Sequence, residues 1–348
     1  MGRYVEALDR EAALLPRIGV ETLYVGGGTP TELSAVDLAR LLGAVEARFG
    51  PIDRMRESTV EANCESLDDE KLGILRLAGI GRLSLGLQTP DDALLASSGR
   101  RHTWEDFRRV FEKARRLPFS LNVDLIFGLP GQTRAGFLDG LRRVLAMEPD
   151  HLSLYALHVA EKTVFHRLGI REDPDLSRAM MEDALEVLAR AGYRHYEISN
   201  FARPGRESLH NINYWRNGPY LGLGCGAAGY VDGERYQNFD RIEPYLEAVE
   251  SGRRPVASTE RLEGKESLGE TMMLGLRMTD GLPLTPALAE AFREEISRVL
   301  ERGLAVLEGG CSRSLPRLRL SREGLFLASE AMREFVPPFE DRSPKESA

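Results

Sequence analysis

The chain has 348 residues, with 46 lysines and arginines against 54 aspartates and glutamates, so its formal net charge is −8. This length allows one large domain, or one large and one small domain. The acidic balance argues against a free nucleic-acid binder, and no apolar run approaches the ~18 residues of a membrane span. The N-terminus MGRYVEALDREAALL is patterned as an amphipathic helix and not as a signal peptide, so we expect a cytoplasmic protein.

The cysteines are widely spaced. Cys64, Cys225 and Cys311 are separated by 161 and 86 residues. This spacing excludes a disulfide framework and every local CxxxCxxC or CxxC motif, and with them a cysteine-built zinc or iron–sulfur site in one loop. We expect the cysteines to be inert small residues and predict no metal ligands in this chain.

The first half of the chain alternates apolar, β-branched runs with amphipathic stretches, which is typical of a parallel sheet covered by helices. A first helix has Val5, Leu8, Ala12 and Leu15 on one face. The predicted strands are 22–25, 58–61, 82–86, 120–127 and 151–156. The predicted helices between them are 34–49, 67–78, 103–116 and 133–147.

Polar or glycine-rich segments follow every predicted strand. In chain order they are GGGTP, EAN, Gln88, Asp124 with FGLP, and Tyr155 with His158. In a β/α barrel the carboxyl ends of the strands meet on one face and build the site, whereas a doubly wound sheet concentrates such residues at one switch point. We therefore predict an α/β fold with an open, partial barrel, assigned to residues 1–200.

The stretch from Asn200 to Tyr230 interrupts this pattern, and it is too long, aromatic and glycine-rich for a simple connector. We assign 201–258 to this loop region, a helix at 242–251 and a linker at 252–258. We predict a small winged-helix-like domain at 259–336 and a disordered tail at 337–348.

The elements expected in the small domain are three helices, two short strands and a last helix capped by Ser321. The helices are at 265–278, 285–292 and 294–302, and the strands at 305–307 and 317–320. Residues 261–320 carry nine basic and nine acidic side chains, which gives no support for a nucleic-acid partner.

Several candidate site residues have two readings. The glycines at 26–28 and Thr29 form either a loop that offers backbone N–H groups to a ligand or a tight turn between strand and helix. Glu61 is either an acceptor for ribose hydroxyls or an amine, or a surface carboxylate. Polar residues such as Gln88, Arg100 and Asp124 are individually as consistent with helix caps as with a site. Their convergence at one end of the predicted strands favours a site.

Two motifs lie in the irregular segment. The sequence from Gly224 to Gly229 matches GxGxxG, but no βαβ unit opens there, so we expect a loop in close contact with other backbone. His210 in HNINYW is either a structural, hydrogen-bonded histidine or a ligand or substrate contact.

Together, GGGTP, EAN, SLGLQT, NVDLIFGLPGQT and SLYAL resemble the radical S-adenosylmethionine (SAM) proteins of the coproporphyrinogen III oxidase-like group. HNINYW, GLGCGAAG and LSREGLFLASEAM are similar to the haem-chaperone branch of that group. The resemblance implies a partial (β/α)6 barrel that binds SAM, with haem as a cargo delivered to haem-requiring respiratory membrane proteins. By motif, the SAM pocket would contain Gly27, Gly28, Thr29, Glu61, Gln88, Arg100, Asp124 and Ala156, and His210 would contact haem or substrate.

The chain departs from the family pattern at the cluster. Such proteins hold a [4Fe-4S] cluster with three cysteines of CxxxCxxC after the first strand, and this sequence has neither that strand nor the motif. We expect the cluster cysteines upstream of Met1, in a true N-terminus about 40 residues earlier, because a barrel without its first strand has an open edge. The alternative is a variant without a cluster.

Three functions follow from these observations, and a haem chaperone is favoured over the other two. The alternatives are an oxygen-independent coproporphyrinogen III oxidase and a SAM-binding barrel without radical chemistry. Whether the chain is an enzyme and whether it forms a homodimer stay open.

Overall fold

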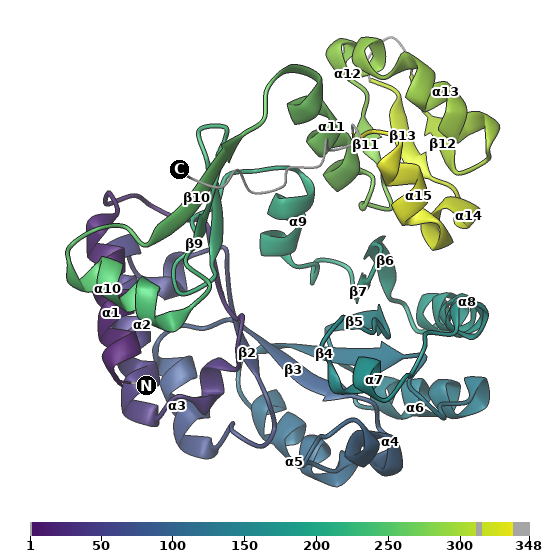
Figure 1. The fold of residues 1–348 in the computed structure, drawn as a ribbon. Coiled ribbons are helices and arrows are strands. Elements are labelled where there is room, and N and C mark those ends of the chain that lie inside the picture. Colours follow the sequence, from purple (N-terminus) through teal and green to yellow (C-terminus); the bar gives the residue numbers. More distant parts are fainter. Residues whose placement is uncertain (1, 311–314, 337–348) are drawn as a thin grey trace. The chain divides into compact units, whose positions relative to one another are not determined.

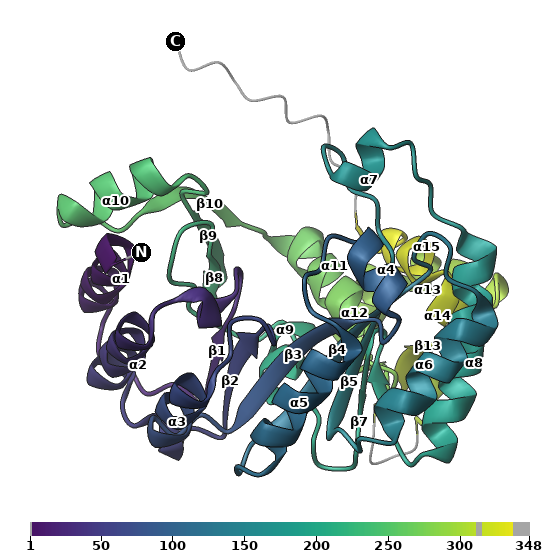
Figure 2. The ribbon, with the colours of Figure 1, turned by 90° about the horizontal axis from the view of Figure 1, so that it is seen from below.

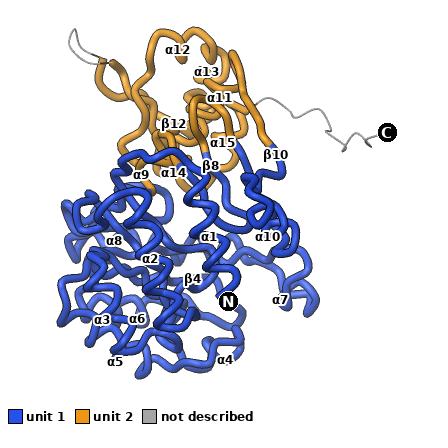
Figure 3. The backbone as a smooth tube through the Cα atoms, turned by 90° about the vertical axis from the view of Figure 1, so that its left-hand side faces the viewer, with its two compact units in different colours: residues 1–210, 221–229, 236–258 blue, residues 211–220, 230–235, 259–348 orange. Residues whose placement is uncertain are grey.

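The computed structural model describes residues 2–310 and 315–336 (Figure 1). The chain divides into two compact units, coloured separately in Figure 3. The first runs to His210 and includes Leu221–Gly229 and Tyr236–Ser258; the second contains Asn211–Tyr220, Tyr230–Arg235 and the chain from Thr259. The predicted tail and Cys311 lie outside the described residues, and the predicted domain boundaries stay a prediction.

A seven-stranded sheet with the order β1-β2-β3-β4-β5-β7-β6 forms the centre of the first unit. Five parallel strands come first: β1 (Thr22–Val25), β2 (Glu57–Ala62), β3 (Arg82–Gln88), β4 (Ser120–Phe127) and β5 (His151–Ala156). Because each strand pairs with the next one in the chain, the order is that of a barrel, and the predicted α/β partial barrel is confirmed. The sheet then continues beyond β5 with two antiparallel strands, β7 (Asn200–Ala202) and β6 (Arg194–Glu197).

Helices cover one face of this sheet (Figures 1 and 2). They are α2 (Ala35–Phe49), α3 (Asp69–Leu77), α4 (Asp92–Ser97), α5 (Trp104–Arg115), α6 (Arg134–Leu145) and α8 (Pro174–Arg190). Side chains cap most of them: Ser34, Asp68, Thr103 and Thr133 each accept a hydrogen bond from a backbone N–H of the first turn. The sequence pattern did not predict α4, α8 or the short α7 (Val164–Arg167).

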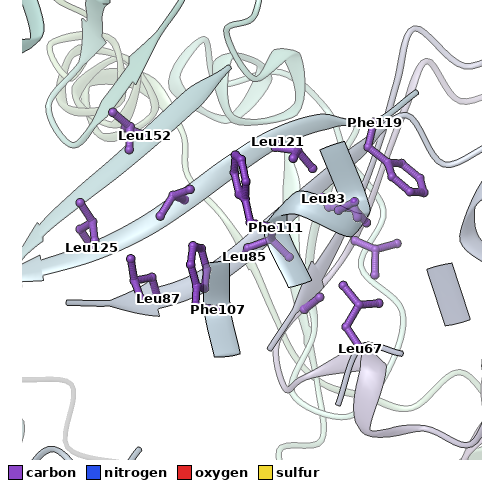
Figure 4. Packing of buried hydrophobic residues seen from close by; sticks show 14 of the residues in the cluster. Leu67, Leu83, Leu85, Leu87, Phe107, Phe111, Phe119, Leu121, Leu125 and Leu152 are labelled. Carbon is purple, nitrogen blue, oxygen red and sulfur yellow. The ribbon is translucent and has the colours of Figure 1, made fainter. Parts of the chain in front are cut away.

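The core lies between the sheet and these helices (Figure 4). On the covered face, β3 contributes Leu83, Leu85 and Leu87, which are packed in one cluster with Phe107 and Phe111 of α5. The intervening residues of each strand point to the opposite side, which we call the inner face. Parallel strands that are buried on both sides usually have continuous apolar runs, so the strict alternation here marks the inner face as polar.

The first unit is completed by α1 (Gly2–Leu14), which packs against α2 and α10 (Ile242–Glu250). Two 3-10 turns, Pro30–Glu32 and Ile52–Arg54, precede α2 and β2 respectively. A separate three-stranded sheet has the order β10-β9-β8, formed by Val256–Arg261, Glu234–Asn238 and Ala228–Val231. The predicted linker at 252–258 is therefore wrong at its C-terminal end, because residues 256–258 belong to β10.

The HNINYW motif forms α9 (Leu209–Trp215). The remaining elements belong to the second unit: α11 (Gly264–Gly275), β11 (Leu282–Pro283), α12 (Pro286–Ala291), α13 (Arg293–Glu301), β12 (Ala305–Glu308), β13 (Arg317–Leu320), α14 (Arg322–Phe326) and α15 (Ala328–Arg333). Ser321 accepts a hydrogen bond from Gly324 N, as predicted for a cap. Among the described residues, no helix combines the length and the apolar character needed to cross a membrane.

Candidate functional site

The inner face of the sheet carries a row of polar side chains from five neighbouring strands. They include Tyr24, Glu57, Glu61, Arg82, Ser84, Asn122, Asp124, His151, Ser153 and Tyr155. Several of them are buried, with Ser84, Asn122 and His151 all exposed by 5% or less. Polar groups at that depth need hydrogen-bond partners, and the structure supplies them in two connected clusters.

The first cluster surrounds Glu61 at the end of β2. One oxygen of the Glu61 carboxylate accepts a hydrogen bond from the Tyr24 hydroxyl at 2.6 Å, and the other accepts one from Gly27 N at 3.3 Å. A Cβ atom added at Gly26 would lie 2.7 Å from the Tyr24 ring and 2.8 Å from Glu61 Cδ. Gly26 is therefore required by close packing, and the carboxylate is held in place from two sides.

The glycine-rich loop after β1 leaves space for a ligand. Gly27 has φ +94°, and a Cβ atom added at Gly27 or Gly28 would meet nothing within 4 Å. Thr29 accepts a hydrogen bond from the Asn63 side chain at 3.0 Å. The loop combines a turn with an open stretch of backbone, and the contact of this backbone with a ligand stays a prediction.

Gln88 ends β3 in a strained conformation. Its φ is +72°, which is uncommon for a residue with a side chain, and the register with β4 shifts between Gly86 and Gln88. A Cβ atom at Gly86 would lie 3.1 Å from the Gln88 amide nitrogen and 2.9 Å from the Asn63 amide oxygen. The two amides therefore approach each other over Gly86, and the bulge aims Gln88 toward the inner face.

Asp124 lies in the middle of the polar row on β4. Its carboxylate accepts hydrogen bonds from the Ser84 hydroxyl and the Asn122 amide, both at 2.8 Å. Burial raises the pKa of Asp124, and the nearby Glu61 charge acts in the same direction. Burial likewise raises the pKa of Tyr155 to about 12. The charge of Glu61 thus reaches Asp124 across the inner face of the sheet.

Arg100 and Ala156 are less closely joined to this group. The segment after Arg100 is tied to the loop after β2, because Arg101 N and His102 N both donate to Glu65 Oε1, at 2.9 and 3.0 Å. Ala156 is the exposed last residue of β5 and is paired with Phe127 of β4. The structure therefore ties the chain next to Arg100 to the loop after β2 and places Ala156 at the carboxyl end of β5, and their part in a SAM pocket stays a prediction.

His210 belongs to the second cluster, deeper on the inner face. Its Nδ1 lies 2.8 Å from the Thr22 hydroxyl at the start of β1. Its ring stacks on Tyr24 with centroids 5.4 Å apart and planes 26° apart. Glu57 accepts hydrogen bonds from Leu209 N and His210 N at 2.9 and 3.1 Å. Burial lowers the pKa of His210, so the neutral imidazole is favoured.

A cavity of about 280 Å³ opens at the end of β3. It lies between the end of β3 and the start of α6 and is lined by Gln88, Asp91, Gln132, Thr133 and Arg143 among others. Of the predicted SAM residues, it includes Gln88 only. Glu61 and Asp124 point instead to the inner face of the sheet.

The comparisons with known proteins agree with this architecture. Residues 2–144 match the model of the radical SAM superfamily, and residues 262–327 match that of the HemN C-terminal domain. The haem chaperone HemW of Bacillus subtilis is 35% identical over 345 residues, covering 96% of this chain and 91% of that protein. HemW of Lactococcus lactis is 38% identical over 305 residues, or 86% and 78% of the two chains.

The chain belongs to the HemW family of haem chaperones. A solved structure of coproporphyrinogen III oxidase HemN from Escherichia coli matches with a TM-score of 0.81 over 96% of this chain and 82% of that one, at 23% identity. That likeness shows the shared fold. The resemblance seen in the sequence motifs, to the haem-chaperone branch of this group, is confirmed.

Membership of the radical SAM superfamily implies SAM and a [4Fe-4S] cluster, and the residues that the structure describes do not fit the cluster. In residues 2–310 and 315–336, no three His, Cys, Asp or Glu side chains are grouped to hold a metal ion. Cys64 packs against the core of the barrel, where burial raises its pKa to about 12. Cys225 packs beside α1 and α10 in another cluster, and burial raises its pKa also. Both thiols are therefore poor thiolate ligands.

Sequence reasoning missed the side chains that hold the predicted site residues together. Tyr24, Asn63 and Ser84 support Glu61, Thr29 and Asp124, and Glu57 supports the backbone of His210. The signal that reveals them is the alternation of polar residues along strands whose other face is apolar. In the GxGxxG segment, residues 224–227 form the predicted loop close to other backbone, where Gly226 N donates to Phe239 O at 2.8 Å. Ala228 and Gly229 begin β8 instead, and a Cβ atom at Gly229 would overlap the Tyr236 ring at 2.2 Å.

Proposed function

We propose that this chain binds SAM at the carboxyl ends of β1 to β5 and binds haem as a cargo that it passes to haem-requiring respiratory proteins. The observation that supports the SAM site is the convergence of Glu61, Gln88 and Asp124 with the open backbone of Gly27 and Gly28. Family membership supports the haem cargo. A cytoplasmic location, a homodimer and the identity of the acceptor stay predictions.

The chemistry of each group fits one part of SAM. The carboxylate of Glu61, fixed in part by the Gly27 N–H, suits the methionine ammonium, and the backbone N–H of Gly28 suits the methionine carboxylate. The Asp124 carboxylate and the Gln88 amide suit the ribose hydroxyls, and Thr29 and Arg100 add a hydroxyl and a positive charge. Ala156, at the edge of the sheet, suits the adenine.

SAM binding is tested by calorimetric titration of Glu61→Gln and its matched control Glu32→Gln. Loss of the charge-assisted hydrogen bond is expected to weaken SAM about tenfold or more. Glu32 is exposed in the turn after the glycine-rich loop, so Glu32→Gln should bind as the wild type does. Equal affinities for all three proteins would contradict the SAM site.

Haem binding is tested by titration followed in the Soret band, with His210→Ala and the exposed His166→Ala as its control. We expect His210→Ala to weaken haem or to shift the band, and His166→Ala to do neither. Incubation with coproporphyrinogen III, SAM and a reductant separates the chaperone from an oxidase, because only an oxidase would consume the porphyrinogen. A wild type without a haem complex would contradict the proposed cargo.

A further inference from the structure

Tyr24 joins the two clusters of the inner face through its hydroxyl and its ring. The hydroxyl donates to Glu61 Oε1 at 2.6 Å. The face of the ring stacks on His210, with centroids 5.4 Å apart. A single residue of β1 thus contacts both the carboxylate assigned to SAM and the imidazole assigned to haem.

The environment of Tyr24 keeps it a hydrogen-bond donor in a fixed position. Burial, the Glu61 charge and the hydrogen bond to Glu61 all raise the pKa of Tyr24, so its hydroxyl stays protonated. The Tyr24 ring packs so closely on Gly26 that a Cβ atom added to this glycine would lie 2.7 Å from Tyr24 Cε1. The ring therefore has no room to move toward the glycine-rich loop. His210 is held against the other side by Thr22 at 2.8 Å.

We propose that Tyr24 is a positioning residue for both ligands, its hydroxyl fixing Glu61 for SAM and its ring fixing His210 for haem. The inference rests on the proposed function. The hydroxyl and the ring act in different ways. A neutral hydroxyl donor restricts a carboxylate to one rotamer, whereas an aromatic face restricts the plane of a stacked imidazole. The two effects belong to different atoms of one side chain and are separable by substitution.

The test uses two variants that remove these atoms in turn. Tyr24→Phe removes the hydroxyl and keeps the ring, so we expect SAM to bind about five- to tenfold more weakly while the haem affinity and Soret band stay unchanged. Tyr24→Leu removes both, so we expect the same loss for SAM together with a haem affinity lowered about three- to tenfold and a shifted Soret band. Tyr193→Phe, which loses a hydroxyl bonded to Pro149 O elsewhere in the unit, is the matched control and should change neither ligand.

A measurement without ligands checks the geometry separately. In the proton NMR spectrum, the His210 ring protons should show a ring-current shift that persists in Tyr24→Phe and disappears in Tyr24→Leu. Normal SAM affinity in Tyr24→Phe, or normal haem binding in Tyr24→Leu, would overturn the inference. A wild type that shows the ring-current shift but binds neither SAM nor haem would instead overturn the proposed function, and the positioning role with it.

Discussion

Glu57 and Arg82 form an ion pair at 3.5 Å although only 8% and 7% of their side chains are exposed. They lie on adjacent parallel strands, and both reach the segment before α9: Glu57 binds Ser208 Oγ at 3.0 Å, and Arg82 donates to Arg206 O. The pair therefore fastens the start of the HNINYW helix to the inner face of the sheet.

The first prediction concerns this pair. Arg82→Met leaves the Glu57 charge buried without its partner, so we expect the free energy of unfolding to fall by about 3–5 kcal/mol. The matched control is Arg56→Met, which breaks the exposed pair of Arg56 with Glu21 at 2.8 Å and should cost at most about 1 kcal/mol. Urea unfolding measures both. Equal losses in the two variants would mean that the buried pair has no special role.

The second prediction concerns the close contact at Gly26. Gly26→Ala places a methyl group against Tyr24 and Glu61, so we expect SAM affinity to fall at least about tenfold and stability by about 1–3 kcal/mol. Gly43→Ala is the control, because that glycine is exposed in α2 and a Cβ there meets nothing within 4 Å. The control should be stabilised by about 0.5–1 kcal/mol and bind SAM normally. Full SAM affinity in Gly26→Ala would show that Glu61 does not need its present position.

The third prediction separates stability from binding at Gln88. Gln88→Gly removes the side chain from a backbone with φ +72°, so we expect the free energy of unfolding to rise by about 0.5–1 kcal/mol while SAM affinity falls. Lys162→Gly, at φ +68° in an exposed turn, should gain similar stability with no change in SAM affinity. Thermal unfolding and calorimetry check the pair. A destabilised Gln88→Gly would argue that the residue serves the fold instead.

The fourth prediction concerns pH and Glu11 of α1, which is 3% exposed. Its carboxylate accepts hydrogen bonds from Gly224 N, Asn238 and the Tyr245 hydroxyl. Burial nevertheless raises its pKa above the ordinary 4.5. The folded state then holds the proton more tightly than the unfolded state, so this contribution to stability is fully present below pH 4.5 and is lost as the pH rises through the folded pKa.

Glu11→Gln removes this titration. Between about pH 4 and about pH 7, the unfolding free energy of the wild type should therefore fall relative to Glu11→Gln, by about 1.4 kcal/mol for each unit of pKa shift. Asp9→Asn, on the exposed side of the same helix, should follow the wild type. A wild type and Glu11→Gln with parallel pH profiles would contradict the raised pKa.

The sequence by itself determined the parallel strands, the covering helices and the strand ends that carry the candidate SAM site. These depend on short-range physics: alternation with period two places Leu83 and Leu85 on one side and Ser84 on the other, and a capping side chain such as Ser34 or Thr133 is read within three residues. Parallel pairing also brings Glu61 and Asp124 to the same face of the sheet, whereas the conformation of Gln88 depends on the bulge after Gly86.

Only the tertiary structure decided what His210 contacts. Thr22 is 188 residues away in sequence, and the hydrogen bond between them has no local signal. The same holds for Glu57 beneath α9 and for Tyr24 between His210 and Glu61, because these contacts form only after the chain returns across the inner face. Local periodicity specifies which way a side chain points, and the packing of distant segments decides what it meets there.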